Sequence, residues 1–350
     1  MTAVKAVLSE GVKDSGPPVY VHHASSIEHD TGSHPEGPDR IPAIEREMAA
    51  HDWSGYRRLQ APQVSEEALT AVHPAPYVRA IERLAEAGGG ALDPDTVVSN
   101  GSYEAALRAA GGACALVEAL LGGHASIGFS GMRPPGHHAL PAHAMGFCLF
   151  NNAAIAARHA LQRLGARRVL LFDWDVHHGN GSNDIFHAER DVLFASIHQS
   201  PLYPGTGPPS DVGSGGGTGY TVNMPVPPGS GEDLWLSHVE HVLVPVARAF
   251  RPDLVLVSAG FDAHRDDPLA TCLLTEGSFA ELARWARLLA AEAGAPLGLV
   301  LEGGYHLGAL ARSVRATLEA AAAGGDPRSV PCHPLSERVG AHVSRHWALV

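Results

Sequence analysis

Acidic and imidazole side chains alternate where a run of apolar residues ends, in a spacing suited to a divalent metal ion. The apolar run 169–172 is followed by Asp173, Asp175 and His177, with two glycines just beyond. Alternate residues of a strand point to the same side, so these three side chains can share one face. Two carboxylates and an imidazole are costly to bring together without a cation, and zinc accepts both kinds of ligand.

A second apolar run, 254–257, ends in the same way, at a glycine followed by Asp262. Catalytic zinc sites hold three protein ligands and keep one position open for water. Asp175, His177 and Asp262 are therefore the predicted ligands. Their two negative charges balance those of the divalent ion, which still lowers the pKa of its bound water. Iron(II) suits the same ligands and stays an alternative.

Two adjacent imidazoles and a phenol complete the set of reactive groups. His137 and His138 follow a proline-stiffened turn, and Tyr305 follows two glycines at the end of another apolar run. One imidazole can take a proton from water and the pair can return it to a leaving amine. Tyr305 can donate to the developing oxyanion, while Asp173 is the right type to orient His137 and raise its basicity. This combination predicts metal-assisted amide hydrolysis without a covalent intermediate.

The elements that must position these groups alternate between strand and helix. This order predicts an α/β fold, an open and mostly parallel doubly wound sheet with helices on both faces. Ser102 is expected to cap one helix, and Ser230 with Asp233 to form a capping box on another. We expect one catalytic domain over residues 1–325 and a C-terminal tail over 326–350. The predicted strands are 19–21, 169–172, 192–197, 254–257 and 297–301, and the predicted helices are 41–50, 103–121, 152–164, 232–250, 276–293 and 307–323.

Composition restricts the partners and the compartment. With 25 basic and 37 acidic residues among 350, the chain carries a net charge of −12, which argues against direct nucleic-acid binding. Its four cysteines form no CxxC pair and suit reduced thiols in a cytoplasm. Neither a signal-peptide pattern nor eighteen consecutive apolar residues occurs. We expect a cytoplasmic protein without a membrane partner.

With these residues identified, the chain resembles the histone deacetylase and acetylpolyamine amidohydrolase superfamily, and its class II-like branch in particular. The resemblance implies an arginase-like open α/β sheet and spans roughly residues 20–323. It implies one zinc ion per chain on the three ligands above, with His137 and His138 as a dyad and Tyr305 as a carbonyl clamp. The motifs that carry it are RPPGHHA at 133–139, GFCLFNN at 146–152, DWDVHHGNG at 173–181, PGTG at 204–207, SAGFDAH at 258–264 and LEGGY at 301–305.

The resemblance also implies a second ion and a distinct partner for each histidine. A structural potassium ion is expected near Asp173, Asp175, His177, Ser196 and Ile197, largely through main-chain oxygens. Asn180 stands where another branch of the family has an acid, so His138 is expected to have a neutral partner. Family members with histidine at the clamp position are poor acetyl-lysine hydrolases, so the tyrosine implies activity.

The substrate is expected to be an acetylated lysine of a peptide or protein. Members that prefer acetylated polyamines carry an acidic gatekeeper where this chain has Leu269, although Asp266 and Asp267 keep a cationic small molecule possible. Gly146 is expected to make room for the aliphatic stem, and Phe147 with Tyr203 to wall a tunnel.

Three alternatives remain open at this level. An acetylated polyamine or other small N-acyl amine is the first. His264, two residues beyond Asp262, suggests a two-metal ureohydrolase. A non-catalytic protein that binds acyl-lysine is the third, though it would be marked by a damaged dyad or a missing tyrosine. A homo-oligomer is possible.

Overall fold

The computed structural model describes residues 16–348, so the first fifteen residues of the expected domain and the last two of the expected tail lie outside it. An eight-stranded sheet crosses the molecule in the order β2-β1-β5-β10-β9-β6-β7-β8, and every neighbouring pair is parallel. The strands are β1 (Val19–His22), β2 (Arg57–Gln60), β5 (Ile127–Ser130), β6 (Val169–Asp173), β7 (Val192–Gln199), β8 (Thr221–Val226), β9 (Leu254–Ala259) and β10 (Leu297–Leu301).

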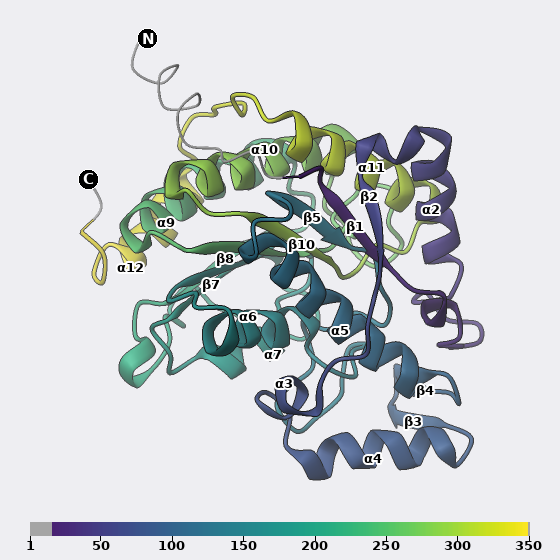
Figure 1. Ribbon diagram of the computed structural model, residues 1–350. Helices are drawn as coiled ribbons and strands as arrows, with labels where there is room; N and C mark the ends of the chain where they lie inside the picture. The colour runs from purple at the N-terminus through teal and green to yellow at the C-terminus, as the bar shows by residue number, and fades with distance from the viewer. Residues whose placement is uncertain (1–15, 349–350) are drawn as a thin grey trace.

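Helices cover both faces of this sheet (Figure 1), which confirms the predicted doubly wound architecture. Along β6, Leu170 and Phe172 belong to one hydrophobic core, and Val169 and Leu171 to the other. Both faces of a central parallel strand must be apolar, which explains its unbroken apolar run. One face carries α2 (Arg40–Ala50), α8 (Glu232–His238), α9 (Val244–Phe250), α10 (Glu276–Ala293) and α11 (Leu307–Ala323). The other carries α5 (Ser102–Leu121), α6 (Asn152–Arg163) and α7 (Asn180–Phe186), and α3 (Glu66–Thr70) and α4 (Ala75–Glu86) pack on α6 and α5.

Strand order decides which chain ends meet. β9 lies between β10 and β6, although the three strands are far apart in sequence. Ser258 of β9 is paired with both Asp173 of β6 and Val300 of β10. The carboxyl ends of three parallel strands therefore open at one edge of the sheet, the usual position of a ligand site.

Local capping differs from the sequence expectation at two helices. Ser102 is the first residue of α5, not its cap, and its hydroxyl contacts His29 Nδ1 at 2.6 Å. The expected capping box at α8 is wrong, because the helix begins after Gly231 and the Ser230 hydroxyl donates to the carbonyl of Pro227. The predicted helix 232–250 continues through a π-helical turn, Val239–Leu243, between α8 and α9.

Several short elements were not predicted from the sequence. β8 contains Pro225, which a sheet tolerates because β8 is an edge strand. β2 and β5 have only four residues each, too few for a clear periodic pattern. A separate two-stranded hairpin, β3 (Gly90–Asp93) and β4 (Thr96–Val98), lies beside α4 in Figure 1.

The segment after residue 325 packs against the sheet's outer edge. Its helix, α12 (Pro334–Val343), buries Val339 and Val343 in the same core as β8. The Trp347 indole N–H donates to the carbonyl of Gly219 at 2.7 Å. These contacts cover the β8 edge, which would otherwise expose unpaired backbone groups. Between residues 16 and 348, no helix combines the length and the apolar character that crossing a membrane requires.

Candidate active site

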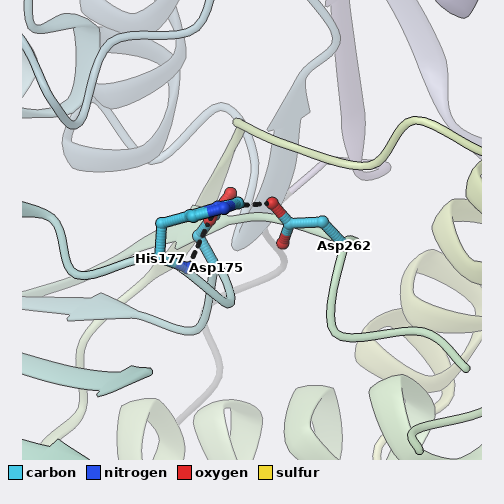
Figure 2. Close-up of side chains that lie close together, drawn as sticks. All are labelled: Asp175, His177 and Asp262. Carbon is cyan, nitrogen blue, oxygen red and sulfur yellow. Dashed lines mark hydrogen bonds and ion pairs between the residues drawn. The ribbon is translucent and has the colours of Figure 1, made fainter. Parts of the chain in front are cut away.

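Asp175, His177 and Asp262 converge just beyond the carboxyl ends of β6 and β9 (Figure 2). One ligand atom from each lies within 4.8 Å of the others, and all three residues are buried. The Nδ1 atom of His177 is 3.1 Å from Asp175 Oδ1 and 3.0 Å from Asp262 Oδ2. Within residues 16–348 this is the only group with the composition and spacing of a metal site.

The two carboxylates are fixed by backbone N–H groups through their other oxygens. Gly303 donates to Asp175 Oδ2 at 2.8 Å, and Val176 donates to Asp262 Oδ1 at 2.9 Å. A Cβ atom on Gly303 would lie 2.3 Å from Asp262 Oδ2, so only glycine fits this close approach. The donor set of two carboxylates and one imidazole, held rigidly, fits zinc or iron(II).

The charge balance of this group also favours a cation. Burial lowers the pKa of His177, but hydrogen bonds to Asp175 and Asp262 outweigh that effect and raise it to about 10. The two acids thus hold a positive charge between them, in the form of a proton when no ion is bound. A divalent ion would displace this proton, because metal binding and ligand protonation compete.

The two adjacent histidines lie beside this group with different partners. Their ring centroids are 4.0 Å apart, and the His138 ring is 5.9 Å from the His177 ring. His137 Nδ1 donates to Asp173 Oδ2 at 2.9 Å, as the sequence analysis expected. His138 Nδ1 donates to Asn180 Oδ1 at 2.7 Å. Both contacts leave Nε2 as the ring atom free for chemistry.

These partners separate the proton affinities of the two rings. Burial lowers the pKa of His137, but the charges of Asp175 and Asp173 raise it to about 10. Burial lowers the pKa of His138 well below its ordinary value, and the charge of His137 lowers it further. The pair can therefore hold one proton on His137 and a free lone pair on His138.

Tyr305 is half-buried on the loop that follows β10. Burial and the charge of Asp262 raise the pKa of Tyr305 well above its ordinary value, so the phenol stays protonated and able to donate. The guanidinium carbon of Arg40 lies 5.1 Å from the Tyr305 ring centroid. The backbone N–H of Tyr305 donates to Asp267 Oδ2 at 2.7 Å. The loop is thus held from two sides.

Similarity to known proteins identifies the family to which the chain belongs. A model of the histone deacetylase domain matches residues 34–321. The chain is 40% identical over 310 residues to "Histone deacetylase 14, chloroplastic" of Arabidopsis thaliana, which covers 83% of this chain and 73% of that protein. It is 44% identical over 253 residues to the "Histone deacetylase-like amidohydrolase" of Pseudomonas aeruginosa, covering 71% of this chain and 67% of that protein. This chain belongs to the histone deacetylase family.

A solved structure shares its fold. The "Crystal Structure of HDA15 HD domain" superposes with a TM-score of 0.89 at 35% identity and covers 96% of both chains. The predicted superfamily and the predicted open α/β fold are therefore confirmed. Membership in the histone deacetylase family makes the chain a hydrolase of the deacetylase type.

In this histone deacetylase family member, the residues expected to make room for the substrate and to wall a tunnel lie beside His138 and Tyr305. Gly146 and Phe147 have φ values of 56° and 69°, and the Phe147 N–H donates to Thr96 Oγ1 at 3.2 Å. A Cβ atom on Gly146 would lie 2.4 Å from a ring carbon of His138. The ring of Tyr203, which is 38% exposed, is 5.2 Å from that of His138. Phe147 and Tyr203 therefore lie close to the reactive groups.

Other residues expected in the site lie outside the group of ligands, histidines and Tyr305. Asp173 pairs with Ser196 across β6 and β7, which brings two of the residues expected around potassium side by side. Leu269 lies on the loop of Asp267, and its N–H donates to Asp267 Oδ1 at 3.0 Å. His264, the residue that suggested a second metal, stays outside the ligand group. Its Nε2 atom is 3.5 Å from Glu276 Oε2.

A buried ion network lies behind the site. Arg40 donates to Glu36 Oε1 at 3.0 Å and to the carbonyl of Gly304 at 2.8 Å. Arg133 reaches the same carboxylate and donates to Glu36 Oε2 at 2.6 Å. All three side chains are fully buried. Through Arg133, Glu36 is connected to the turn that carries His137 and His138. Through Arg40, it is connected to the loop that carries Tyr305.

Two buried acids have structural roles that the sequence did not reveal. Asp267 accepts the backbone N–H of Tyr305, and Glu302 accepts backbone N–H groups of Gly136 and His137. Glu302 follows the apolar run of β10 directly, as Asp173 closes that of β6. The same signal, an acid at the end of a buried strand, could therefore have identified it. Nothing in the sequence marks Asp267 as different from the exposed Asp266.

Proposed function

We propose that this protein is a zinc-dependent amidohydrolase that removes acetyl groups from acetylated lysine side chains. The observation that carries the proposal is the convergence of Asp175, His177 and Asp262 beside two histidines with unequal partners. Zinc held by the three residues would act as a Lewis acid toward the amide carbonyl and the attacking water. The remaining steps belong to side chains of the chain itself.

The histidine pair moves the protons. With Nδ1 bound to Asp173 or Asn180, each ring presents Nε2 to the reacting atoms. The neutral ring takes the proton from water at its Nε2, and the pair returns a proton to the leaving amine. Asp173 keeps the His137 ring oriented and favours its protonated form, as carboxylate partners of catalytic imidazoles do.

Tyr305 supplies the other half of the oxyanion site. Its raised pKa keeps the phenol protonated, and the phenol donates to the carbonyl oxygen as negative charge develops there. Arg40 lies against the Tyr305 ring and Asp267 accepts the Tyr305 backbone N–H, so the residue needs little reorganisation at the moment of reaction. A preformed donor of this kind stabilises the transition state more than the substrate.

A structural potassium ion belongs to the same proposal. Asp173, Asp175 and His177 on one strand end, with Ser196 and Ile197 on the next, supply oxygen atoms suited to a hard monovalent cation. Iron(II) in place of zinc remains compatible with the three ligands. The proposed compartment is the cytoplasm.

The loop of Leu269 supports an acetylated lysine in a peptide or protein as the substrate. Leu269 offers no charge to a distant ammonium group, and Asp267 is occupied by backbone N–H groups. The exposed Asp266 favours the second candidate, an acetylated polyamine, because its carboxylate faces solvent. The third candidate is a protein that binds acyl-lysine in the same pocket and releases no acetate.

One experiment separates these functions. Metal-free protein is reloaded with zinc, and turnover of an acetyl-lysine peptide is measured beside turnover of an acetylated polyamine. The proposal expects acetate release with kcat/KM for the peptide at least about ten-fold higher, a preference of roughly 1.4 kcal/mol. The reverse preference would identify a polyamine deacetylase. Tight peptide binding without acetate would identify a binding protein.

A further inference from the structure

We propose that Glu302 is a positioning residue that fixes the backbone of the catalytic His137 through two hydrogen bonds to a single carboxylate oxygen. The Glu302 Oε2 atom accepts the N–H of Gly136 at 2.7 Å and the N–H of His137 at 3.1 Å. The carboxylate is fully buried. The inference rests on the proposed function, because it assigns Glu302 a part in the work of the dyad.

The carboxylate itself is held firmly, so it can serve as a reference point. Its other oxygen, Oε1, accepts from the hydroxyl of Ser258 on β9 at 3.3 Å. The Glu302 backbone N–H donates to the carbonyl of Ala259 at 3.0 Å, and its carbonyl accepts from the guanidinium of Arg40. Glu302 is thus bonded to β9, to the Arg40 network and to the dyad turn.

The dyad turn needs such an anchor because it is not part of any strand or helix. Gly136 packs so closely that a Cβ atom there would lie 2.5 Å from the backbone nitrogen of Asn152. The Asn152 side-chain N–H donates to the carbonyl of Pro134 at 3.0 Å, which holds the turn from the opposite side. Glu302 therefore sets the distance between this turn and the ends of β9 and β10.

That distance decides where the imidazole lies. His137 is tied at its backbone to Glu302 and at its ring to Asp173, which are both at strand ends. A shift of about 1 Å in a catalytic group can cost about 10²-fold in rate. The hydrogen bonds of the Glu302 carboxylate go to Gly136, His137 and Ser258 and to none of the three proposed ligands, so its effect should pass through His137.

Two conservative substitutions distinguish the effect of the position of the Glu302 carboxylate from the effect of its charge. Glu302→Gln keeps the length of the side chain and an amide oxygen for the two N–H groups, while its NH₂ group can donate to Ser258. Glu302→Asp keeps the charge and withdraws the carboxylate by one methylene. Positioning predicts that Glu302→Gln keeps kcat within about three-fold of the parent, whereas Glu302→Asp loses about 10- to 100-fold in kcat with KM within about two-fold.

A second readout does not depend on turnover. Hydrogen exchange of the Gly136 and His137 amides in the zinc-loaded protein should be as slow in Glu302→Gln as in the parent and faster in Glu302→Asp. Glu319→Gln, at a partly exposed position of α11 where the carboxylate pairs with Arg315, is the matched control and should change neither kcat nor these amides. Equal zinc content and thermal midpoints confirm that each variant is folded and loaded.

The pattern of results decides the inference. Full activity in Glu302→Asp would overturn it, and so would a loss in Glu302→Gln as large as that in Glu302→Asp, since charge would then matter more than position. If the parent itself releases no acetate, the proposed function fails. In that case the exchange rates still report whether Glu302 fixes the turn.

Discussion

The reactive centre and the rim of the site are built on different principles. At the centre, Asp175, His177 and Asp262 are buried at the ends of β6 and β9, and each carboxylate oxygen has a hydrogen-bond partner. At the rim, Phe147 and Tyr203 lie on loops, one with a positive φ and the other 38% exposed. The chemistry is therefore fixed by the sheet, while the shape offered to the substrate depends on loops.

This difference predicts how the two regions respond to change. Buried groups with complete hydrogen bonding cannot relax, so a substitution leaves an unpaired charge or an empty ligand position. Loop residues can shift, so a substitution there alters preference more than rate. The predictions below test this contrast.

The largest effect is expected at the centre. Asp262→Ala removes one of the three proposed ligands and should lower both zinc content and kcat/KM, the latter by about 10³-fold or more, since the metal contributes several kcal/mol. Metal analysis and a peptide turnover assay measure the two quantities. Asp266→Ala, four residues along on the exposed loop, is the control. Full zinc content in Asp262→Ala would place the ion elsewhere.

A smaller loss is expected where the centre meets the rim. Tyr305→Phe removes one donor to the oxyanion and keeps the ring against Phe147, so kcat should fall by about 10²- to 10³-fold with little change in zinc content. Steady-state kinetics on the acetyl-lysine peptide measure this loss. Tyr220→Phe, remote from the site, controls for loss of a phenol. Unchanged kcat in Tyr305→Phe would remove the clamp from the mechanism.

At the rim, a change of charge should alter preference. Leu269→Glu introduces a carboxylate on the loop of Asp267, and the ratio of kcat/KM for acetylated polyamine over acetyl-lysine peptide should rise by about ten-fold, or about 1.4 kcal/mol. Leu269→Gln has the same shape without the charge and should leave the ratio near the parental value. Equal ratios in the two variants would show that this position does not sense an ammonium group.

The smallest effect at neutral pH concerns a buried histidine just before α4. His73 Nδ1 donates to the carbonyl of Pro141, and Nε2 accepts the N–H of Asn151 at 2.9 Å, so the ring must be neutral. Burial lowers the pKa of His73 to about 4. The unfolded chain binds its proton near pH 6.5, so the free energy of unfolding falls as pH drops from about 6.5 to 4, by up to about 3 kcal/mol.

Urea unfolding at pH 7 and pH 5 measures this contribution. His73→Gln can keep a donor and an acceptor without titrating, and it should reduce the loss of stability between the two pH values. His124→Gln, at an exposed position, should leave that loss at its parental size. If His73→Gln and His124→Gln lose equal stability on acidification, another group is responsible.

The sequence alone predicted the parallel sheet and the groups that meet at its edge. Apolar strands such as β6 end in acids. This pattern depends only on residues that are neighbours in the sequence, so it can be recognised without the structure. The cap at Ser230 was predicted wrongly because several helix starts satisfy the same local pattern.

Only the tertiary structure decided which partners these residues have. Glu302 and His137 are 165 positions apart, and Asp267 and Tyr305 are 38 apart, yet each pair is joined by a hydrogen bond. Residues of one strand reveal which side they face, but not which strand lies beside them. The order of β10, β9 and β6 supplies that information, because long-range pairing depends on how the whole apolar surface is buried.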